Sequence, residues 1–253
     1  DATPVRMAGI AQAFTDPAQA GSSHSCALVD QLIDDAARDG ADAALIEQRP
    51  DGSGLALSVP DGFTLMPQSD LELSVTESSR HGAPMTLVRG GEDRDLAAMA
   101  AMGQVRATAF RFHLHRDADL IKHAITRARL RAGLAAPGAR EVVFVIAEEG
   151  ITAAAYVVLS VAGGSWTVEE CGDRDPSGAR VGAILQALIA RAPSEARPVI
   201  RAWLPTGFVP PQVTVRRGTP ATDVRLMIRA LTPAASRLPL TGDDSIFWQS
   251  DLL

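Results

Sequence analysis

Apolar residues recur along this chain at the spacings that predict alternating strands and helices. A stripe of apolar positions between residues 25 and 38 fits one face of a helix, which Gly40 ends. Residues 181–191 carry apolar side chains at i, i+3, i+4, i+7 and i+8, a second and cleaner helical pattern. Two further helices are expected at 92–102 and 117–134. Strands are expected at 5–14, 41–46, 71–75, 85–88, 110–115, 141–147, 153–160, 165–171, 199–203, 213–215 and 224–231.

The same order of features occurs twice, which predicts two related halves. Each copy has an Asp-Pro pair, a helix, a short strand, a Gly-Phe turn, a strand and a final apolar-apolar-Arg segment. The paired features are 16–17 and 175–176, 25–38 and 181–191, 41–46 and 199–203, 62–63 and 207–208, 71–75 and 213–215, and 87–89 and 227–229. We expect a first domain at residues 1–91, a second at 92–231 and a tail at 232–253.

Composition narrows the class of protein. Hydrophobic residues make up 46% of the chain and charged residues 21%, as in ordinary globular proteins with a core. The net charge of −6 argues against a nucleic-acid partner, which usually requires a basic surface. Two cysteines do not make a disulfide framework. No apolar run is long enough for a membrane span and no signal peptide is evident, so we expect a cytoplasmic protein with no membrane partner.

One segment of the second copy has the form of an anion site. A strand at 167–171 leads through a Gly-containing loop at 175–179 into a helix that begins near Arg180. The first N–H groups of a helix have no partner within the helix, and the helix dipole favours negative charge there. Gly182 would let a diphosphate approach the backbone, and Arg180 could pair with it.

Two stretches in this half resemble the GNAT superfamily of acyl-CoA-dependent N-acetyltransferases, namely Asp175-Pro-Ser-Gly-Ala-Arg-Val-Gly-Ala-Ile-Leu and Trp203-Leu-Pro-Thr-Gly-Phe. The first half is similar to it in Phe14-Thr-Asp-Pro, Gly62-Phe63 and Val88-Arg89, so the resemblance spans about residues 5–231 as a tandem pair. It implies an α/β fold of two GNAT-like halves, each a twisted mixed β-sheet flanked by helices, with the first half reduced.

The resemblance also implies a reaction and a cofactor site. The reaction would be transfer of an acyl group from acetyl-CoA, or another acyl-CoA, to an amine of a small molecule. Backbone N–H groups of Arg180, Val181, Gly182 and Ala183 would hold the pyrophosphate. The strand segment Val168–Glu170 would hydrogen-bond the pantetheine arm.

Glu169 and Glu170 are the candidate general bases, since deprotonation of an ammonium group needs a carboxylate beside it. Regular alternation would turn one of them toward the cleft, whereas the alternative role for both is a solvated edge carboxylate. The family's tyrosine general acid has no counterpart, because the only tyrosine, Tyr156, lies on a different strand. His113 and His115 share one side of a strand, but no third ligand is suitably spaced, and no metal site is expected.

Departures from the family's phosphate loop, Q/R-x-x-G-x-G/A, favour a second interpretation. Ser177 stands at the Q/R position and Arg180 at the first glycine. In the first copy Ala20, Ser23 and Ser25 occupy the three motif positions, so we expect that loop to be empty. The alternative function is a non-catalytic or repurposed scaffold or binding protein, or an enzyme of unrelated chemistry. Transfer from an aminoacyl-tRNA is disfavoured by the acidic charge.

The short first half also suggests self-association. Its sheet has too few strands to cover its own edge, and an open edge must be covered. The adjacent aromatics Phe247 and Trp248 could anchor a neighbouring subunit. We therefore expect a homodimer formed through the incomplete half, the tail or both. The alternative is a tail that folds back onto its own chain.

Overall fold

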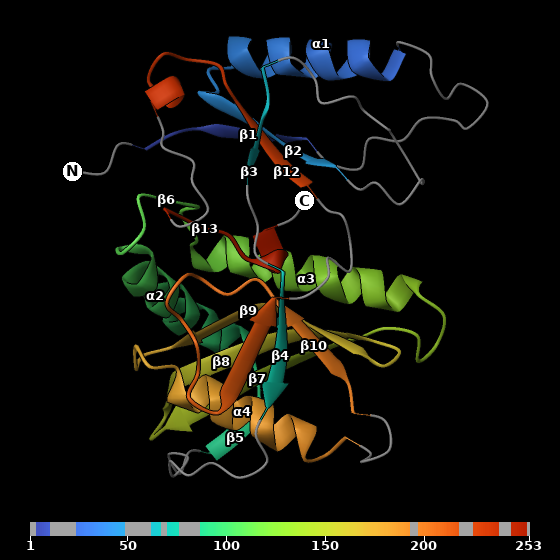
Figure 1. Ribbon diagram of the computed structural model, residues 1–253, viewed down its shortest axis with the longest axis vertical. Coiled ribbons are helices and arrows are strands. Elements are labelled where there is room, and N and C mark those ends of the chain that lie inside the picture. Colours follow the sequence, from blue (N-terminus) through green and yellow to red (C-terminus); the bar gives the residue numbers. More distant parts are fainter. Residues whose placement is uncertain are drawn as a thin grey trace. The chain divides into compact units, whose positions relative to one another are not determined.

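A computed structural model describes residues 4–10, 24–48, 62–66, 70–75, 87–192, 197–217, 225–237 and 244–251. These residues form two compact units (Figure 1). Unit 1 comprises 1–68, 220–244 and 252–253, and unit 2 comprises 69–219 and 245–251. Each unit is described by itself. None of the described helices is both long and apolar enough to cross a bilayer.

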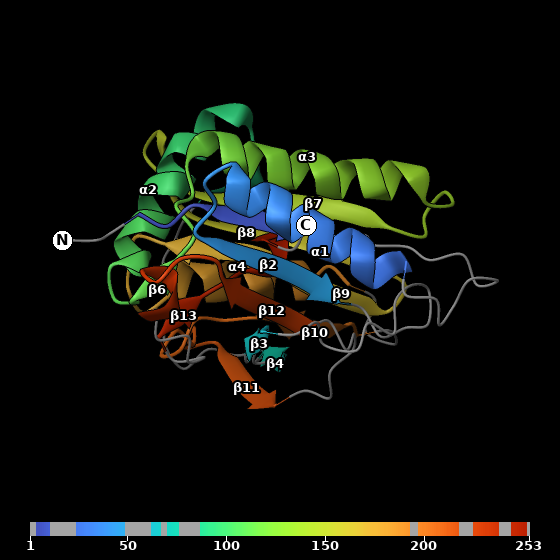
Figure 2. The same ribbon diagram turned by 90° about the horizontal axis from the view of Figure 1, so that it is seen from above.

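Unit 1 is a four-stranded sheet with one long helix. The strand order is β1-β2-β12-β3, with β1 parallel to β2 and β12 antiparallel to both its neighbours. Helix α1 lies along β1 and β2 (Figure 2) and buries Val29 and Ile33 against Ile46 and Met227 of the sheet. Its elements are β1 (Met7–Ile10), α1 (His24–Arg38), β2 (Ala43–Gln48), β3 (Thr64–Met66), β12 (Arg225–Ala230) and η4 (Ala235–Arg237).

Unit 2 is built on a seven-stranded sheet in the order β11-β4-β10-β9-β8-β7-β5, in which only β9 and β10 run parallel. Its elements are β4 (Leu71–Val75), β5 (Leu87–Gly90), η2 (Asp93–Asp95), α2 (Leu96–Ala107), β6 (Phe112–His113), α3 (Ala118–Leu134), β7 (Glu141–Glu149), β8 (Thr152–Ala162), β9 (Ser165–Asp173), α4 (Ala179–Ile189), β10 (Val199–Ala202), β11 (Val213–Arg217), β13 (Ser245–Ile246) and η5 (Gln249–Asp251).

Helices cover both faces of this sheet: α2 and α3 lie on one face and α4 on the other (Figure 1). On the first face Met99 and Ile121 pack with Tyr156 of β8. On the second face Ile184 packs with Val157 of the same strand. Because β8 is buried on both faces, its sequence is a nearly continuous apolar run rather than an alternating one.

The two sheets have matching halves, and each contains a strand from the other part of the chain. The β9–α4–β10 segment corresponds to β1–α1–β2, since both join parallel neighbours. In unit 2, β4 lies between β10 and β11 and pairs antiparallel with each of them. In unit 1, β12 lies in the same way between β2 and β3 and pairs antiparallel with each of them. Strand β4 is therefore the counterpart of β12, rather than of residues 213–215 as the sequence repeat suggests.

This exchange changes the domain boundaries expected from the sequence. Strands β4 and β5 precede residue 92 but lie in the sheet of unit 2, and β12 precedes residue 232 but lies in the sheet of unit 1. A short apolar strand is stabilised by whichever open edge pairs with it, and that edge need not be the nearest in sequence. Most of the first phosphate loop, including Ala20 and Ser23, lies outside the described residues.

Residues 245–251 pack within unit 2 of their own chain. This agrees with the alternative given above, in which the tail folds back and does not anchor a second subunit. Strand β13 pairs in parallel with β6. Phe247 and Trp248 are buried, and the Phe247 ring centroid lies 5.7 Å from that of Phe112. These aromatics therefore stabilise their own chain and do not form an exposed contact for a second subunit.

Candidate functional site

The two candidate carboxylates lie at an irregular point of β9. Val158 of β8 pairs with Glu170, but the next residue, Leu159, pairs with Val168, so Glu169 is the extra residue of a β-bulge. The bulge interrupts the alternation of side chains. Both glutamates line a cavity beside α3, whereas Val168 packs in the core on the α4 side. Contrary to the expectation from a regular strand, alternation does not separate the two carboxylates.

Glu170 is engaged by a buried polar network. Its side chain is 2% exposed. One oxygen accepts a hydrogen bond from the Tyr156 hydroxyl at 2.6 Å, and the other pairs with the Arg116 guanidinium at 2.5 Å. Arg116 also pairs with Asp251 of the C-terminal segment. Burial and the neighbouring carboxylate raise the pKa of Tyr156 well above its usual range, so the phenol stays protonated and donates. Glu170 thus has no oxygen without a protein partner.

Glu169 has a different environment. Burial raises the pKa of its carboxyl, although a hydrogen bond with Ser160 and the charges of Arg131, Arg140 and Arg127 oppose that shift. A raised pKa suits a general base that works near neutral pH. The adjoining cavity has a volume of only about 30 Å³, which is space for roughly one water molecule.

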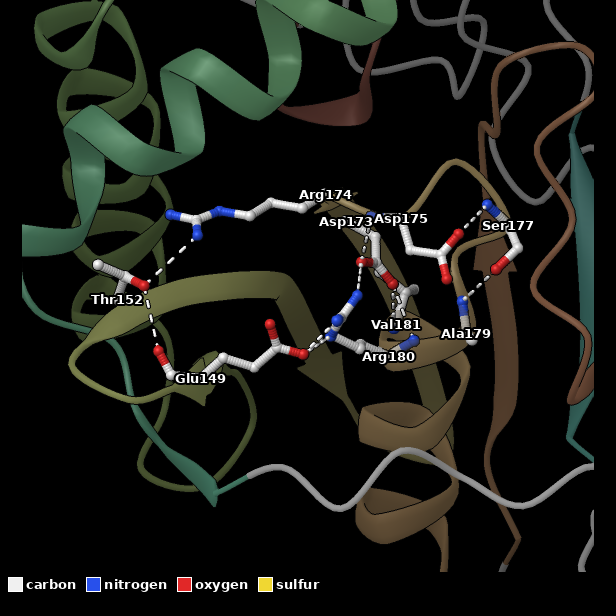
Figure 3. Close-up of polar contacts among 9 residues, drawn as sticks. All are labelled: Glu149, Thr152, Asp173, Arg174, Asp175, Ser177, Ala179, Arg180 and Val181. Atoms are coloured by element: carbon white, nitrogen blue, oxygen red, sulfur yellow. Dashed lines mark hydrogen bonds and ion pairs between the residues drawn. The ribbon is translucent and has the colours of Figure 1, made fainter.

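The amino end of α4, where the sequence predicts a diphosphate, is occupied by a side chain of this protein. The buried carboxylate of Asp173 accepts hydrogen bonds from the backbone N–H of Arg180 at 2.8 Å and of Val181 at 3.4 Å (Figure 3). Its other oxygen accepts from the Asp175 N–H at 2.9 Å and from the Arg180 guanidinium at 3.1 Å. Asp173 therefore provides the negative charge that a helix amino terminus favours.

The remaining amides of this turn also have acceptors within the chain. The Gly178 N–H donates to the Asp175 carbonyl at 3.0 Å, and the Ala179 N–H donates to the Ser177 hydroxyl at 3.3 Å. The Gly182 N–H donates to the Gly178 carbonyl at 3.0 Å, as in a regular helix. Each amide from Gly178 to Gly182 is consequently hydrogen-bonded without a ligand. Ala183, the last residue assigned to the pyrophosphate by the sequence, follows them within α4.

The glycines of this segment serve packing. A Cβ atom at Gly182 would lie 1.9 Å from Oε1 of Gln212, and one at Gly178 would lie 2.6 Å from the Phe208 ring. Gly178 also has φ of 73°, a left-handed conformation that glycine adopts readily. The Arg106 guanidinium stacks on the ring of Phe208, with its central carbon 3.6 Å from the ring centroid. The absence of side chains at Gly178 and Gly182 thus lets the loop after β10 pack closely against the start of α4.

The charge around this helix end is predominantly acidic. Nε of Arg180 donates to Glu149 at 2.9 Å, so Arg180 is shared between two carboxylates (Figure 3). The Ser177 N–H donates to Asp175, and this hydrogen bond lowers the pKa of that carboxyl. A diphosphate here would be repelled by the carboxylates of Asp173, Asp175 and Glu149. It would also find the backbone amides already hydrogen-bonded to acceptors within the chain. The residues at the amino end of α4 do not fit the diphosphate of an acyl-CoA.

The backbone segment Glu169–Asp173 of β9 pairs with β8 on one side but has no strand partner on the other among the described residues. Strand β10 pairs with β9 only from Val199–Ser165 to Ala202–Val168. Among the described residues, no strand continues this ladder along Glu169–Asp173 on the β10 side. An extended ligand that carries amide groups could add to such an open edge.

Sequence reasoning missed Asp173 and Arg116. Asp173 ends a strand a few residues before a helix, and that position is the available signal for a buried helix cap. Arg116 has no local signal, since its partners Glu170 and Ser250 are 54 and 134 positions away. Among the described residues, no group of three or more histidine, cysteine or acidic side chains could hold a metal ion. Cys171 is buried, and burial raises its pKa, which makes it an unreactive thiol.

Comparison with solved structures identifies the fold. A GCN5-related N-acetyltransferase from Kribbella flavida superposes with a TM-score of 0.59 at 18% identity, over 88% of this chain and 52% of that protein. One from Anabaena variabilis superposes with a TM-score of 0.61 at 11% identity, over 89% and 55%. The chain thus spans about half the length of these proteins. Neither a family model nor a curated relative matches it. The predicted α/β fold of GNAT type is confirmed.

Proposed function

We propose that this chain is a GNAT-fold module with a structural or binding role, and that α4 of unit 2 carries no acyl-CoA. The observation behind the proposal is the buried Asp173 carboxylate, which accepts the amides of Arg180 and Val181. An N-acetyltransferase fold does not fix function, because function depends on the residues of the site. In unit 2, those residues hold the protein's own loop in place.

The second candidate is transfer of an acyl group from acetyl-CoA, or another acyl-CoA, to a small-molecule amine. Two observations favour it. The backbone from Glu169 to Asp173 lacks a partner on the β10 side among the described strands, and the raised pKa of Glu169 suits a base. In this candidate Glu169 is the base and Glu170, held by Arg116 and Tyr156, positions the bulge.

Binding of acetyl-CoA distinguishes the two candidates. A ligand that binds only the native state at 100 times its Kd stabilises a protein by about 2.7 kcal/mol, which moves the melting temperature by several degrees. We expect no shift of the melting temperature at millimolar acetyl-CoA and no heat in calorimetric titration. A saturable heat with one site per chain would overturn the structural proposal.

Two variants would then test the second candidate. Ser177→Glu adds a carboxylate at an exposed position of the loop before α4 and should weaken binding there, without the clash that a side chain at Gly182 would make with Gln212. Glu169→Gln should lower turnover without loss of binding, whereas Glu141→Gln, at an exposed carboxylate on β7, should leave both unchanged.

A further inference from the structure

Residues Gln249–Asp251, the turn η5, cover the carboxylates at the β9 bulge. This turn contacts both β9 and α3, and all three belong to unit 2. Gln249 and Ser250 form one wall of the cavity that Glu169 and Glu170 line. Because the Glu170 side chain is only 2% exposed and the cavity has a volume of about 30 Å³, this side of the bulge is closed to a ligand larger than water.

The attachment of η5 is polar. Asp251 pairs with the Arg116 guanidinium, which also donates to the Ser250 hydroxyl at 3.2 Å. The Arg127 guanidinium donates to the Ser250 carbonyl at 2.9 Å. None of the three residues of η5 has an apolar side chain. The contacts described for this turn with β9 and α3 are therefore an ion pair and hydrogen bonds.

The residues immediately before η5 are attached differently. Phe247 and Trp248 are 5% and 3% exposed, so they bury two large apolar surfaces within unit 2. A segment with few apolar contacts can open locally while the rest of the fold stays intact. The two aromatics keep the chain in place when the contact between Asp251 and Arg116 breaks. Gln249–Asp251 is thus a strap with an apolar anchor at its start and an ionic contact at its end.

Arg116 determines which chemical group fits in place of the strap. Its side chain is 8% exposed and pairs with the carboxylates of Glu170 and Asp251. A buried guanidinium that loses one of its acceptors is unfavourable, so the position that Asp251 leaves favours another carboxylate. We propose that Gln249–Asp251 closes the pocket beside the β9 bulge, and that a ligand carboxylate replaces Asp251 on Arg116 when the strap opens. This gives a ligand class to the binding role proposed above, on which it rests, and is independent of the amino end of α4.

Chemical modification of carboxyl groups tests whether the strap opens separately from the fold. Carbodiimide coupling of glycine ethyl ester, read by mass spectrometry, should leave Glu170 and the similarly buried Asp173 of the same strand unmodified in the parent chain. Asp251→Asn should raise the modification of Glu170 by about tenfold or more, because it removes the ion pair that closes the strap. Asp173 should stay protected. Asp119→Asn, at an exposed carboxylate of α3, is the control and should change neither. No increase at Glu170 would overturn the strap.

Hydrogen exchange of the parent chain tests the same point without a variant, and it decides the case in which Asp251→Asn exposes Asp173 as well as Glu170. The Asp251 amide, which donates to the Trp248 carbonyl at 3.0 Å, should exchange through a local opening that low concentrations of urea do not affect. Amides of β9 should exchange through an unfolding that urea promotes. The same dependence on urea at both places would contradict the proposal.

Chemical rescue tests the carboxylate site on Arg116. Asp251→Ala leaves space for acetate beside the guanidinium, so acetate should raise the melting temperature of this variant by several degrees more than chloride at equal ionic strength. Asp119→Ala should respond equally to both salts. An equal response of Asp251→Ala would overturn the carboxylate site. A variant that folds in neither salt would overturn the strap, because a detachable segment is dispensable for folding. This test uses no acetyl-CoA, so it can fail while the proposal for α4 stands.

Discussion

Among single residues, the buried carboxylate of Asp173 joins the end of β9 to the start of α4. We predict that Asp173→Ala lowers the free energy of unfolding by about 2–4 kcal/mol, because each buried donor left without an acceptor costs about 1–3 kcal/mol. The donors are the amides of Asp175, Arg180 and Val181 and the Arg180 guanidinium. Only the contact with Val181 is fully buried, so water can replace the carboxylate at the others. Urea denaturation measures the loss. Asp117→Ala, at the exposed cap of α3, should cost only about 1 kcal/mol, and equal losses would contradict the prediction.

We predict that the Glu169 carboxyl makes the stability of the protein depend on pH. Burial raises its pKa above the ordinary value of 4.5, so the folded protein binds this proton more readily than the unfolded chain. The resulting stabilisation is complete below the unfolded pKa and is lost as pH rises through the folded pKa. Glu169→Gln removes this dependence, so the variant should melt above the parent at neutral pH, with the difference falling as pH approaches 4.

Melting temperatures measured across this pH range check the prediction for Glu169. Glu141→Gln, which changes an exposed carboxylate, is the control and should show a small difference at every pH. A difference between Glu169→Gln and the parent that did not vary with pH would show that titration of this carboxyl is not its cause.

Among elements, the segment from β13 to η5 buries the aromatics Phe247 and Trp248 within unit 2. We predict that Trp248→Ala destabilises the fold by about 3–5 kcal/mol, the usual cost of removing a buried large aromatic side chain. Leu134→Ala, at a leucine exposed near the end of α3, should stay within about 0.5 kcal/mol of the parent. Thermal unfolding of both variants checks this. A loss below 1 kcal/mol for Trp248→Ala would mean that the segment is only loosely attached.

Sequence patterns predicted elements better than the contacts between them. The helix expected at 117–134 is observed at Ala118–Leu134, with Asp117 as its cap, because periodicity and capping are local properties. The strand expected at 71–75 is observed with those bounds. The bulge at Glu169 could not be predicted, since it depends on the register with a neighbouring strand. The capping role of Asp173 could not be predicted either, because it depends on how close the end of β9 lies to the first amides of α4.

In the whole molecule, the exchange of β4 and β12 makes each sheet depend on both parts of the chain. The repeat in the sequence predicted two related halves, and the matching order of strands in the two sheets agrees with it. The repeat could not predict which sheet each strand joins, because an apolar strand fits either antiparallel edge. The fold is thus more interlocked than its sequence suggests, and neither half contains all the strands of its own sheet.

This interlocking predicts how the chain behaves when it is divided after residue 91, at the boundary that the sequence favours. The fragment 92–253 lacks β4 and β5, so β10 and β7 lose partners, and its β12 has no β2 to pair with. The fragment 1–91 lacks β12, which lies between β2 and β3. Neither fragment should fold alone, whereas the two expressed together should associate, because the missing strands are then restored. Co-purification through a tag on one fragment, followed by circular dichroism of each, tests this. A cooperative melting transition in either isolated fragment would show that the exchanged strands are dispensable.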